Sequence, residues 1–509
     1  MKEVVSCERM KQLDAYTIEK RGIPSCVLME RAALKTVEEM EKVFHKNNTE
    51  EKILCVCGSG NNGGDGIAIA RILFLHGYQA EIYVAGNHSS FTHETARQLS
   101  IASNYHVPVV NNPQWREYTT IVDAVFGVGL ARPVMGKYKE LIETMNRMTA
   151  WKVAVDIPSG VNGDTGAVMG AAFEADLTVT FGFLKAGLCL YPGRKNAGRT
   201  VLADIGVYGE SGVFEKKENS GKWKIPKKIP GRTPEGNKST FGKVLAVAGS
   251  PGMCGAAYFC AAAAFAGGAG MVRILTDESN RIPLQSLLPE AIIDCGKGEA
   301  AYQNAFDWCD VILMGPGLGI SEKTRFKVHW FLEKALSGKK VVLDADGLNL
   351  LAENLSWKNL LGSHVILTPH MGEMSRLTGK SIGELQDSRE ASALEYARAS
   401  GSVCVLKDAC TVTAGSDGTV WYNLSGNAGM ATAGSGDVLA GVLAGMLCMY
   451  RGEALSVGEM TEIAALGVFI HGRAGDLAAE NKGMYGMKAG DLLLTIPEVL
   501  KYGGRHEEI

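Results

Sequence analysis

The sequence has little excess charge of either sign. Its 52 Lys and Arg residues are balanced by 55 Asp and Glu residues, for a formal net charge of -3 at pH 7. Proteins that bind nucleic acids or anionic membranes electrostatically carry a clear positive bias. The balance supports neither partner, so we predict no nucleic-acid and no membrane partner.

Paired cysteine motifs are absent as well. The 12 cysteines are scattered and form no spaced CxxC pairs, so neither a zinc site nor a disulfide framework is indicated. Cys55 and Cys57 have the pattern of small apolar core residues. The cysteine usage indicates a reducing compartment, and we expect the protein to be cytoplasmic.

A targeting signal and a membrane span are also missing from the pattern. Residues 1–6 contain no basic region followed by an apolar one, so no signal peptide is expected. The longest apolar stretches, residues 256–269 and 438–447, are rich in Ala and Gly and short for a bilayer crossing. They predict buried helices.

Glycine, in contrast, is plentiful, with 62 of the 509 residues. Glycines permit tight turns and close approach of the backbone to ligands. With 46% hydrophobic and 21% charged residues, the composition is that of an ordinary globular protein, and the length exceeds what one core supports. We expect two large domains.

Residues 8–44 have a helical period that is interrupted at Gly22–Pro24. This pattern predicts two helices that cap a domain or join subunits, and we expect a homo-oligomer. A buried strand at residues 53–57, a glycine-rich loop and another helix follow.

The glycine-rich loop after residues 53–57 contains G-x-G-x-x-G by position. A dinucleotide fingerprint also needs an acidic residue at the end of the next strand, but Glu81 precedes that expected strand, so we discount it. Asn61, Asn62 and Asp65 place three polar side chains at a strand's carboxyl end, which indicates a polar-ligand or cation site. The alternative is that they serve the turn itself.

Three later strands in this half end in a similar way. Asp123 and Asp156 each end a strand and lead into a glycine-containing loop, and Lys185 follows a third strand. A single Asp at such a position is usually a helix cap. Alternating strands and helices imply a parallel sheet, in which the carboxyl ends of the strands share one crevice. Several ligand-like loops in one domain therefore indicate a binding site.

Five motifs of this half occur together: Leu28–Ala32, Gly60–Gly66, Gly127–Pro133, Asp156–Gly160 and Phe181–Gly187. Jointly they resemble the NAD(P)H-hydrate epimerase family, over about residues 1–210. The resemblance implies an α/β domain with a Rossmann-like, three-layer α/β/α fold. Its implied activity is the interconversion of the R and S forms of hydrated NADH and NADPH.

The resemblance also implies site residues. Substrate contacts carry over to Asn61, Asn62, Gly63, Gly64, Asp65, Gly127, Val128, Gly129, Leu130, Ala131, Arg132, Pro133 and Asp156. Potassium ligands carry over to Asn62, Asp123 and Ser159. Because epimerisation next to nitrogen needs proton-transfer groups, we predict Asp156 as the proton carrier, with Lys185 assisting. Ala186 stands where many relatives have Pro, which should leave Lys185 in place.

The sequence changes character between residues 208 and 240, where Pro, Gly and charged residues occur without periodicity. We predict domains at residues 1–212 and 236–509, joined by a linker at residues 213–235. The lysines of this segment are interpreted as part of a solvated connection.

The second half repeats the pattern of a strand followed by small or polar residues, at residues 242–257, 311–319, 341–349, 365–373 and 403–412. In a parallel sheet such strands deliver these residues into one cleft. Lys407 could neutralise a nucleotide phosphate there, or it is a surface lysine. His370 is a structural residue or a substrate contact.

The stretch Asn427–Asp437 runs directly into an apolar helix at residues 438–447. Small residues from Ala431 to Gly436 allow backbone N–H groups to crowd at the helix start, where the helix dipole attracts phosphate. Asp437 lies beside this anion site and could take a proton from a hydroxyl group that attacks a terminal phosphoryl group. The alternative is a packed helix start with Asp437 as a first-turn residue.

These motifs jointly resemble the ADP- or ATP-dependent NAD(P)H-hydrate dehydratase family over residues 236–495, which implies a ribokinase-like α/β fold. Contacts with the hydrated nicotinamide nucleotide carry over to Ala256, Gly319, His370 and Asp437. Contacts with the adenine nucleotide carry over to Lys407, Asp408, Ala409, Cys410, Thr411, Ala428, Gly429, Met430, Ala431, Thr432, Ala433, Gly434, Ser435 and Gly436. Asn237–Ser239 stand where relatives often show His-Lys-Gly, which leaves the role of that entry segment open.

The implied function is repair of hydrated NADH and NADPH. Asp437 would activate the ring hydroxyl of the S hydrate for phosphorylation by ADP, and phosphate would then leave, with AMP as the other product. We expect ADP as co-substrate, Mg²⁺ with its phosphates and K⁺ in the epimerase domain. The alternatives are a small-metabolite kinase that stops at the phosphorylated product, and a first half that only binds nucleotides.

Overall fold

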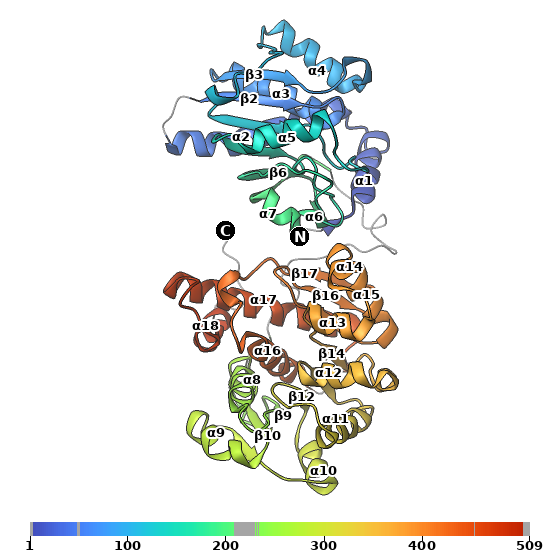
Figure 1. The fold of residues 1–509 in the computed structure, drawn as a ribbon, viewed down its shortest axis with the longest axis vertical. Coiled ribbons are helices and arrows are strands. Elements are labelled where there is room, and N and C mark those ends of the chain that lie inside the picture. The colour runs from blue at the N-terminus through green and yellow to red at the C-terminus, as the bar shows by residue number, and fades with distance from the viewer. Residues whose placement is uncertain are drawn as a thin grey trace. The chain divides into compact units, whose positions relative to one another are not determined.

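The computed structural model describes residues 4–47, 51–207, 230, 232, 234–451 and 454–501. The chain divides into two compact units, Met1–Ser220 and Gly221–Ile509, drawn from blue to green and from yellow-green to red in Figure 1. Most of the predicted linker lies outside the described residues, so its bounds stay a prediction.

The first unit is built on a six-stranded parallel sheet with the order β3-β2-β4-β5-β6-β8. Side chains of the inner strand β2 alternate between two cores: Ile53 and Cys55 belong to one, Leu54 and Val56 to the other. Helices cover both faces, which makes three α/β/α layers. The strands are β2 (Lys52–Cys57), β3 (Gln79–Val84), β4 (Thr120–Ala124), β5 (Trp151–Val155), β6 (Leu177–Phe181) and β8 (Arg199–Ala203).

Helices at the start of the chain pack on their own sheet. Leu28, Ala32 and Val37 of α2 share the core of Ile53 and Cys55, so the helices predicted within residues 8–44 cap their own domain. The core that contains Ile53 and Cys55 also includes residues of α1 (Cys7–Glu19), α2 (Ser25–Asn47), α3 (Asn61–Leu75) and α4 (His93–Asn104). The core that contains Leu54 and Val56 includes residues of α5 (Lys137–Asn146). Shorter elements are β1 (Val4–Val5), which pairs with β7 (Leu184–Lys185), and η1 (His88–Ser90), η2 (Trp115–Glu117), α6 (Ala186–Cys189) and α7 (Gly193–Ala197).

The position predicted for Glu81 is wrong. Glu81 lies inside β3 rather than before it, because this edge strand already begins at the exposed residue Gln79. The Glu81 carboxylate accepts a hydrogen bond of 2.5 Å from the Tyr118 hydroxyl. Since β3 ends at Val84 and Ala85 follows, no carboxylate stands at its end, and the reason for discounting a dinucleotide fingerprint persists.

The second unit has a nine-stranded sheet with the order β11-β10-β9-β12-β13-β14-β15-β16-β17. Strands β9 to β15 are parallel, and β16 and β17 add antiparallel strands at one edge. The strands are β9 (Lys243–Val247), β10 (Met271–Leu275), β11 (Ile292–Asp294), β12 (Val311–Met314), β13 (Lys340–Leu343), β14 (Val365–Leu367), β15 (Val403–Leu406), β16 (Val412–Gly415) and β17 (Val420–Tyr422). Both units are thus α/β with parallel sheets, as predicted.

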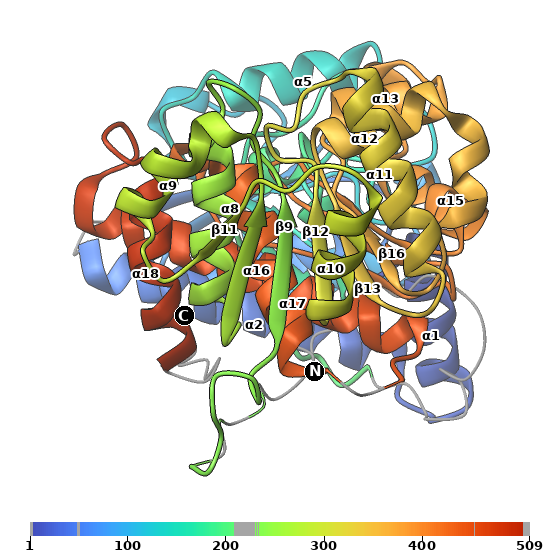
Figure 2. The same ribbon diagram turned by 90° about the horizontal axis from the view of Figure 1, so that it is seen from below.

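Helices lie on both faces of this sheet as well (Figure 2). One core joins the sheet to α8 (Cys254–Ala266), α16 (Ser435–Met449), α17 (Val457–Lys482) and α18 (Ala489–Lys501). The other helices are α9 (Arg281–Leu287), α10 (Glu299–Trp308), α11 (Glu322–Ala335), α12 (Asp346–Glu353), α13 (Met371–Thr378), α14 (Ile382–Asp387) and α15 (Arg389–Ser400), with η3 (Glu278–Asn280), η4 (Leu355–Leu360) and η5 (Ala428–Met430).

The two Ala- and Gly-rich stretches are buried helices, as predicted. They pack closely because a Cβ atom on Gly441 of α16 would lie 2.2 Å from the carbonyl oxygen of Cys260 in α8. One turn later, a Cβ atom on Gly445 would lie 2.4 Å from the carbonyl oxygen of Ala264. Small side chains therefore set the distance between the helices. Within the described part of the chain, no helix is both long and apolar enough to cross a membrane.

Candidate active sites

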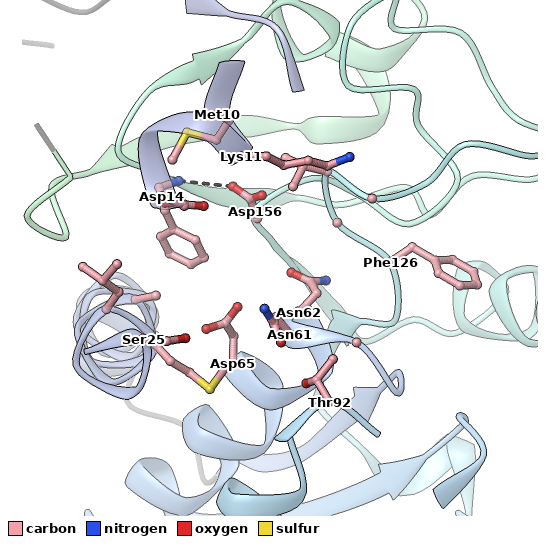
Figure 3. Close-up of a pocket in the computed structure, with 18 of the residues that line it drawn as sticks. Met10, Lys11, Asp14, Ser25, Asn61, Asn62, Asp65, Thr92, Phe126 and Asp156 are labelled. Atoms are coloured by element: carbon pink, nitrogen blue, oxygen red, sulfur yellow. Dashed lines mark hydrogen bonds between the residues drawn. The ribbon is translucent and has the colours of Figure 1, made fainter. Parts of the chain in front are cut away.

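A cavity of about 690 Å³ lies at the carboxyl ends of the strands of the first unit. The loops after β2, β4 and β5 form one side, and α1 and α2 contribute the other (Figure 3). Ligand sites of open α/β sheets lie at this edge, because the loops there come from adjacent parallel strands. Its polar lining residues include Asp14, Asn61, Asn62, Asp65, Asp156 and Lys185.

The glycine-rich loop brings Asn61 and Asn62 to the cavity because it turns directly from β2 into α3. A Cβ atom on Gly63 would lie 2.0 Å from the carbonyl oxygen of Gly58, so this turn requires glycine. The N-cap residue, Gly60, supplies no side-chain cap to α3. The first N–H groups of the helix are therefore available to a ligand, which favours an anion or a carbonyl oxygen.

Asp156 and Lys185 form a buried ion pair in this cavity. Lys185 Nζ lies 2.6 Å from Oδ1 of Asp156 and also donates to the Thr180 hydroxyl and the Phe181 carbonyl, both at 3.0 Å. Oδ1 further accepts hydrogen bonds from the Thr180 hydroxyl and the Phe181 N–H. Since these bonds all end on Oδ1, Oδ2 of Asp156 remains for a group in the cavity. The backbone of Asp156 is held at φ 65°, a strained conformation for this residue.

Asp123 and Ser159 lie beneath the same loops. Oδ1 of the fully buried Asp123 accepts from the Ser159 hydroxyl at 2.6 Å, and Oδ2 accepts from the Ser159 N–H at 2.7 Å. Burial raises the pKa of Asp123 to about 6, although the hydrogen bonds from Ser159 lower it. Asn62 lies against Gly127, and its buried side-chain nitrogen has no hydrogen-bond partner among the described residues. This corner therefore has hard oxygen atoms and an unsatisfied polar group.

Most predicted substrate contacts of the first unit surround the cavity. The structure brings Asn61, Asn62, Asp65, Gly127, Val128, Gly129, Leu130 and Asp156 to its lining. Gly63 and Gly64 are buried and support the turn, whereas Ala131, Arg132 and Pro133 are exposed and are not part of the lining.

Asp14 also lines the cavity, although the sequence did not identify it as a site residue. Its only signal was a lone carboxylate within the helical period of residues 8–44. Burial raises its pKa to about 6, with Lys185 opposing the shift and Asp156 adding to it. Burial likewise raises the pKa of Asp65 well above its usual value, and Asp156 and Asp14 add to that shift. Three carboxyl groups therefore share the cavity with the buried Lys185 ammonium.

In the second unit, Asp437 lies in the first turn of α16, next to the glycine-rich helix start. The N-cap residue, Gly434, has φ 89°, and a Cβ atom there would lie 2.8 Å from the ring of Phe259. Lys407 Nζ lies 3.6 Å from the position that a Cβ atom of Gly436 would take. A helix N-terminus, a cation and a carboxyl group thus meet, which is the arrangement of an anion site with a proton acceptor beside it.

Lys407 is not a surface lysine. Its ammonium lies 2.7 Å from Oδ1 of Asp344 and 3.9 Å from Oε2 of Glu373, and its side chain is 19% exposed. The Lys407 N–H donates to the carbonyl of Pro369, because the strands that precede these residues are close neighbours in the sheet. Burial opposes the charge of Lys407, but Asp344 and Glu373 outweigh burial and raise its pKa.

Two carboxyl groups near this lysine have pKa values close to neutrality. Burial raises the pKa of Asp437 to about 7, with the negative charges of Asp344 and Asp346 adding to the effect and Lys407 opposing it. Burial also raises the pKa of Glu373 to about 7, against the effect of Lys407. A carboxyl group with such a pKa can exchange protons at neutral pH, as general acid–base catalysis requires.

His370 has the structural role that was one of its two alternatives. It is the N-cap of α13, and its Nδ1 accepts hydrogen bonds from the N–H groups of Gly372 and Glu373 at 2.9 and 3.3 Å. The Glu373 carboxylate accepts from the His370 N–H at 2.8 Å, which completes a capping box. The ring is half exposed, so a further contact with substrate stays a prediction.

Two other predicted positions of this unit are Gly319, after β12, and Ala256, near the start of α8. The Gly319 N–H donates to Oδ2 of Asp346 at 2.7 Å, and a Cβ atom on Gly317 would lie 2.8 Å from that of Ala256. The predicted nucleotide loops are Lys407–Thr411 and Ala428–Gly436. In the first, Asp408 pairs with Arg389 at 2.9 Å; the second is anchored by Asn427, which donates to Asp476 of α17 at 3.2 Å.

Comparison with known proteins identifies the family. The family model described as NAD(P)H-hydrate dehydratase matches residues 244–498, and that described as YjeF-related protein N-terminus matches residues 25–187. The bifunctional NAD(P)H-hydrate repair enzyme Nnr of Moorella thermoacetica is 37% identical, over 98% of this chain and 96% of that protein. The enzyme of the same name from Thermofilum pendens is 34% identical, over 98% of this chain and 96% of its own. This chain belongs to the bifunctional NAD(P)H-hydrate repair enzymes.

Membership of the repair-enzyme family confirms the predicted family, fold class and enzyme class: a Rossmann-like domain followed by a ribokinase-like domain, with repair of the hydrated cofactor as the function. Among solved structures, the ADP/ATP-dependent NAD(P)H-hydrate dehydratase of Bacillus subtilis, co-crystallised with ATP and Mg²⁺, is 31% identical, with a TM-score of 0.46. The match covers 54% of this chain and 95% of that one. A ribokinase-like superfamily protein from Enterococcus faecalis is 28% identical, with a TM-score of 0.48, over 54% and 92%.

Proposed function

We propose that the first unit interconverts the R and S hydrates of NADH and NADPH, and that the second unit dehydrates the S hydrate at the expense of ADP. The proposed domain bounds are residues 1–212 and 236–509, and the matches of the two family models, residues 25–187 and 244–498, fall within them. The observation that carries the proposal is the position of Asp437, a carboxyl group with a pKa near neutrality at a helix N-terminus beside Lys407.

The second site would work by phosphorylation. Asp437 takes the proton of the C6 hydroxyl as that oxygen attacks the terminal phosphorus of ADP, and AMP leaves. The C6–O bond then breaks, phosphate leaves and a proton is lost from C5, which restores the dihydropyridine ring. Phosphorylation turns hydroxide into a good leaving group. Lys407 and the N–H groups of residues 434–436 would hold the phosphates, with Lys407–Thr411 and Ala428–Gly436 around the nucleotide.

The first site would use Asp156 as the proton carrier. Oδ2 of Asp156 is the oxygen left without a described hydrogen bond, and Lys185 fixes the carboxyl group through Oδ1. Asn61, Asn62 and the N-terminus of α3 would hold the nucleotide. This arrangement supports proton transfer to and from the hydroxyl group on C6, the carbon next to the ring nitrogen.

A potassium ion fits the corner below this cavity. Asp123 and Ser159 would supply carboxylate and hydroxyl oxygen atoms, and Asn62 would supply its amide oxygen. Hard cations prefer such oxygen ligands, and a bound cation would offset the buried charge of Asp123.

Magnesium would arrive with the nucleotide. Among the described residues, no group of three His, Cys, Asp or Glu side chains is arranged to hold a metal ion. Mg²⁺ is commonly bound through substrate phosphates together with few protein ligands, so we assign it to the ADP phosphates. A cytoplasmic location and a homo-oligomer remain predictions; the scattered cysteines, without spaced CxxC pairs, are typical of a reducing compartment.

Separate variants of the two halves test the proposal. Asp437→Asn should lower dehydration of the S hydrate by about 10²–10⁴-fold and leave epimerisation unchanged, whereas Asp156→Asn should do the reverse. The exposed residues Glu480 and Glu140, each changed to Gln, serve as matched controls.

Product analysis of the wild type distinguishes the reactions. Dehydration yields NADH, AMP and phosphate in equal amounts. A stable phosphorylated product without NADH would instead identify a kinase. Full epimerase activity in Asp156→Asn would remove Asp156 as the proton carrier, and a wild type that does not speed epimerisation above the spontaneous rate would leave the first unit as a binding module.

A further inference from the structure

The epimerase cavity contains a second inward-facing carboxyl group that the mechanism above does not use. Asp65 of α3 lines the cavity together with Asp156. Figure 3 shows these two residues on different sides of the open space, one on the helix that follows β2 and the other after β5. The two groups can therefore reach one ligand from different directions.

The two carboxyl groups have opposite surroundings. Asp156 is paired with the Lys185 ammonium at 2.6 Å and receives hydrogen bonds from Thr180 and Phe181. Asp65 has no hydrogen bond or ion pair within the described ranges. Burial raises the pKa of Asp65 well above its usual value, with the charges of Asp156 and Asp14 adding to the effect. Burial and the neighbouring carboxyl groups thus favour the protonated form of Asp65, whereas Asp156 has a cationic partner.

Inversion at C6 needs this kind of asymmetry. If the hydroxyl group leaves from one face of the ring and water returns on the other, a proton donor is required on one side and an acceptor on the opposite side. A single carboxyl group can serve only the face that it contacts. The requirement is met by two carboxyl groups of which one is protonated.

We propose that Asp65 is the second proton-transfer residue of the epimerase site, working on the face of the ring opposite Asp156. This inference rests on the proposed epimerase function. In one direction, the Asp65 proton passes to the C6 hydroxyl, the C6–O bond breaks and water leaves, while the N1 lone pair forms a C6–N1 double bond. Water at Asp156 then forms the new C6–O bond on the other face, the electron pair returns to N1, and Asp156 takes the proton. In the other direction the two residues exchange roles.

Oxygen exchange measures the two faces separately. In ¹⁸O-labelled water, the wild type should incorporate one ¹⁸O atom at C6 for each epimerisation, above the uncatalysed background. Asp65→Asn should lower epimerisation by about 10²-fold or more, because the second face loses its proton-transfer group. It should still exchange oxygen into one epimer, through Asp156 alone. Asp156→Asn should retain exchange only in the other epimer.

Controls keep the outcomes separate. The exposed Glu140→Gln variant should match the wild type in both assays, and thermal melting of each variant establishes that it is folded. The inference is overturned if Asp65→Asn epimerises at the wild-type rate, if it loses exchange in both epimers equally while folded, or if the wild type inverts C6 without ¹⁸O uptake. Failure of the wild type to interconvert the hydrates would instead overturn the proposed function.

Discussion

Lys185 Nζ lies 2.6 Å from Oδ1 of Asp156, and the whole lysine side chain is buried. A buried ammonium group keeps its charge only with a close partner, and a buried carboxylate has the same requirement. Each residue therefore compensates the charge of the other. The pair also fixes the orientation of a carboxyl group whose backbone lies in a strained conformation.

Replacing Lys185 should reduce both stability and epimerisation. Lys185→Met keeps most of the side-chain volume but leaves Asp156 without its cation, which should destabilise the first unit by about 3–5 kcal/mol. Epimerisation should fall by about 10²-fold or more, because the carboxyl group is no longer oriented. Calorimetric melting and an epimerisation assay measure the two effects. The exposed Lys195→Met variant is the control, and an unchanged melting transition in Lys185→Met would show that the pair is not coupled.

The pH dependence of dehydration should reflect Asp437. As a general base it must be ionised, so kcat/KM for the S hydrate should rise with pH and level off above the pKa of about 7. The charge of Asp344 contributes to raising this pKa. Asp344→Asn should therefore move the rising limb to lower pH, since it removes a like charge and frees Lys407 to pair with Asp437. A limb that stays in place would remove Asp437 as the titrating group.

Gly434→Ala should weaken nucleotide binding. Alanine at φ 89° costs about 1–2 kcal/mol, and the added methyl group would meet the Phe259 ring at 2.8 Å, so the helix start must shift. We expect the Kd for ADP to rise at least about tenfold, as measured by calorimetric titration. Gly490→Ala in the first turn of α18 has open space and is the matched control. Equal affinities of the two variants would place the phosphates elsewhere.

Replacing Asp123 should weaken the dependence of epimerisation on potassium. The wild-type epimerase activity should be higher in KCl than in choline chloride. In Asp123→Asn we expect the affinity for K⁺ to fall at least about tenfold, because the buried carboxylate that the cation would neutralise is gone. Activity is titrated with KCl at constant ionic strength. Identical salt dependence in both proteins would contradict a cation at this corner.

Strand-end residues could be predicted because a parallel sheet gathers them at one edge. The sequence placed Asp123, Asp156 and Lys185 at such ends, and the structure has all three around one cavity or directly beneath it. The position of Asp437 in the first turn of a helix could also be predicted, because small residues before an apolar stretch are typical of a helix start that can bind an anion.

Residues whose environment depends on non-local packing could not be predicted. Asp14 lies within an ordinary helical period, and only the packing of α1 over the sheet brings it to the cavity. The buried charge of Lys407 is compensated by Asp344, which follows β13, and by Glu373, in the first turn of α13. The start of β3 was misplaced because polar residues also occupy exposed edge strands, where propensity is weak.

The most direct test gives the purified protein a mixture of R and S hydrates with ADP and Mg²⁺ and follows the absorbance of the dihydronicotinamide ring. Two working sites predict full recovery of the cofactor at a rate well above spontaneous epimerisation, with one AMP and one phosphate per NADH. A reaction that stops at the S fraction, or one that leaves the absorbance unchanged while ADP is consumed, would contradict the account.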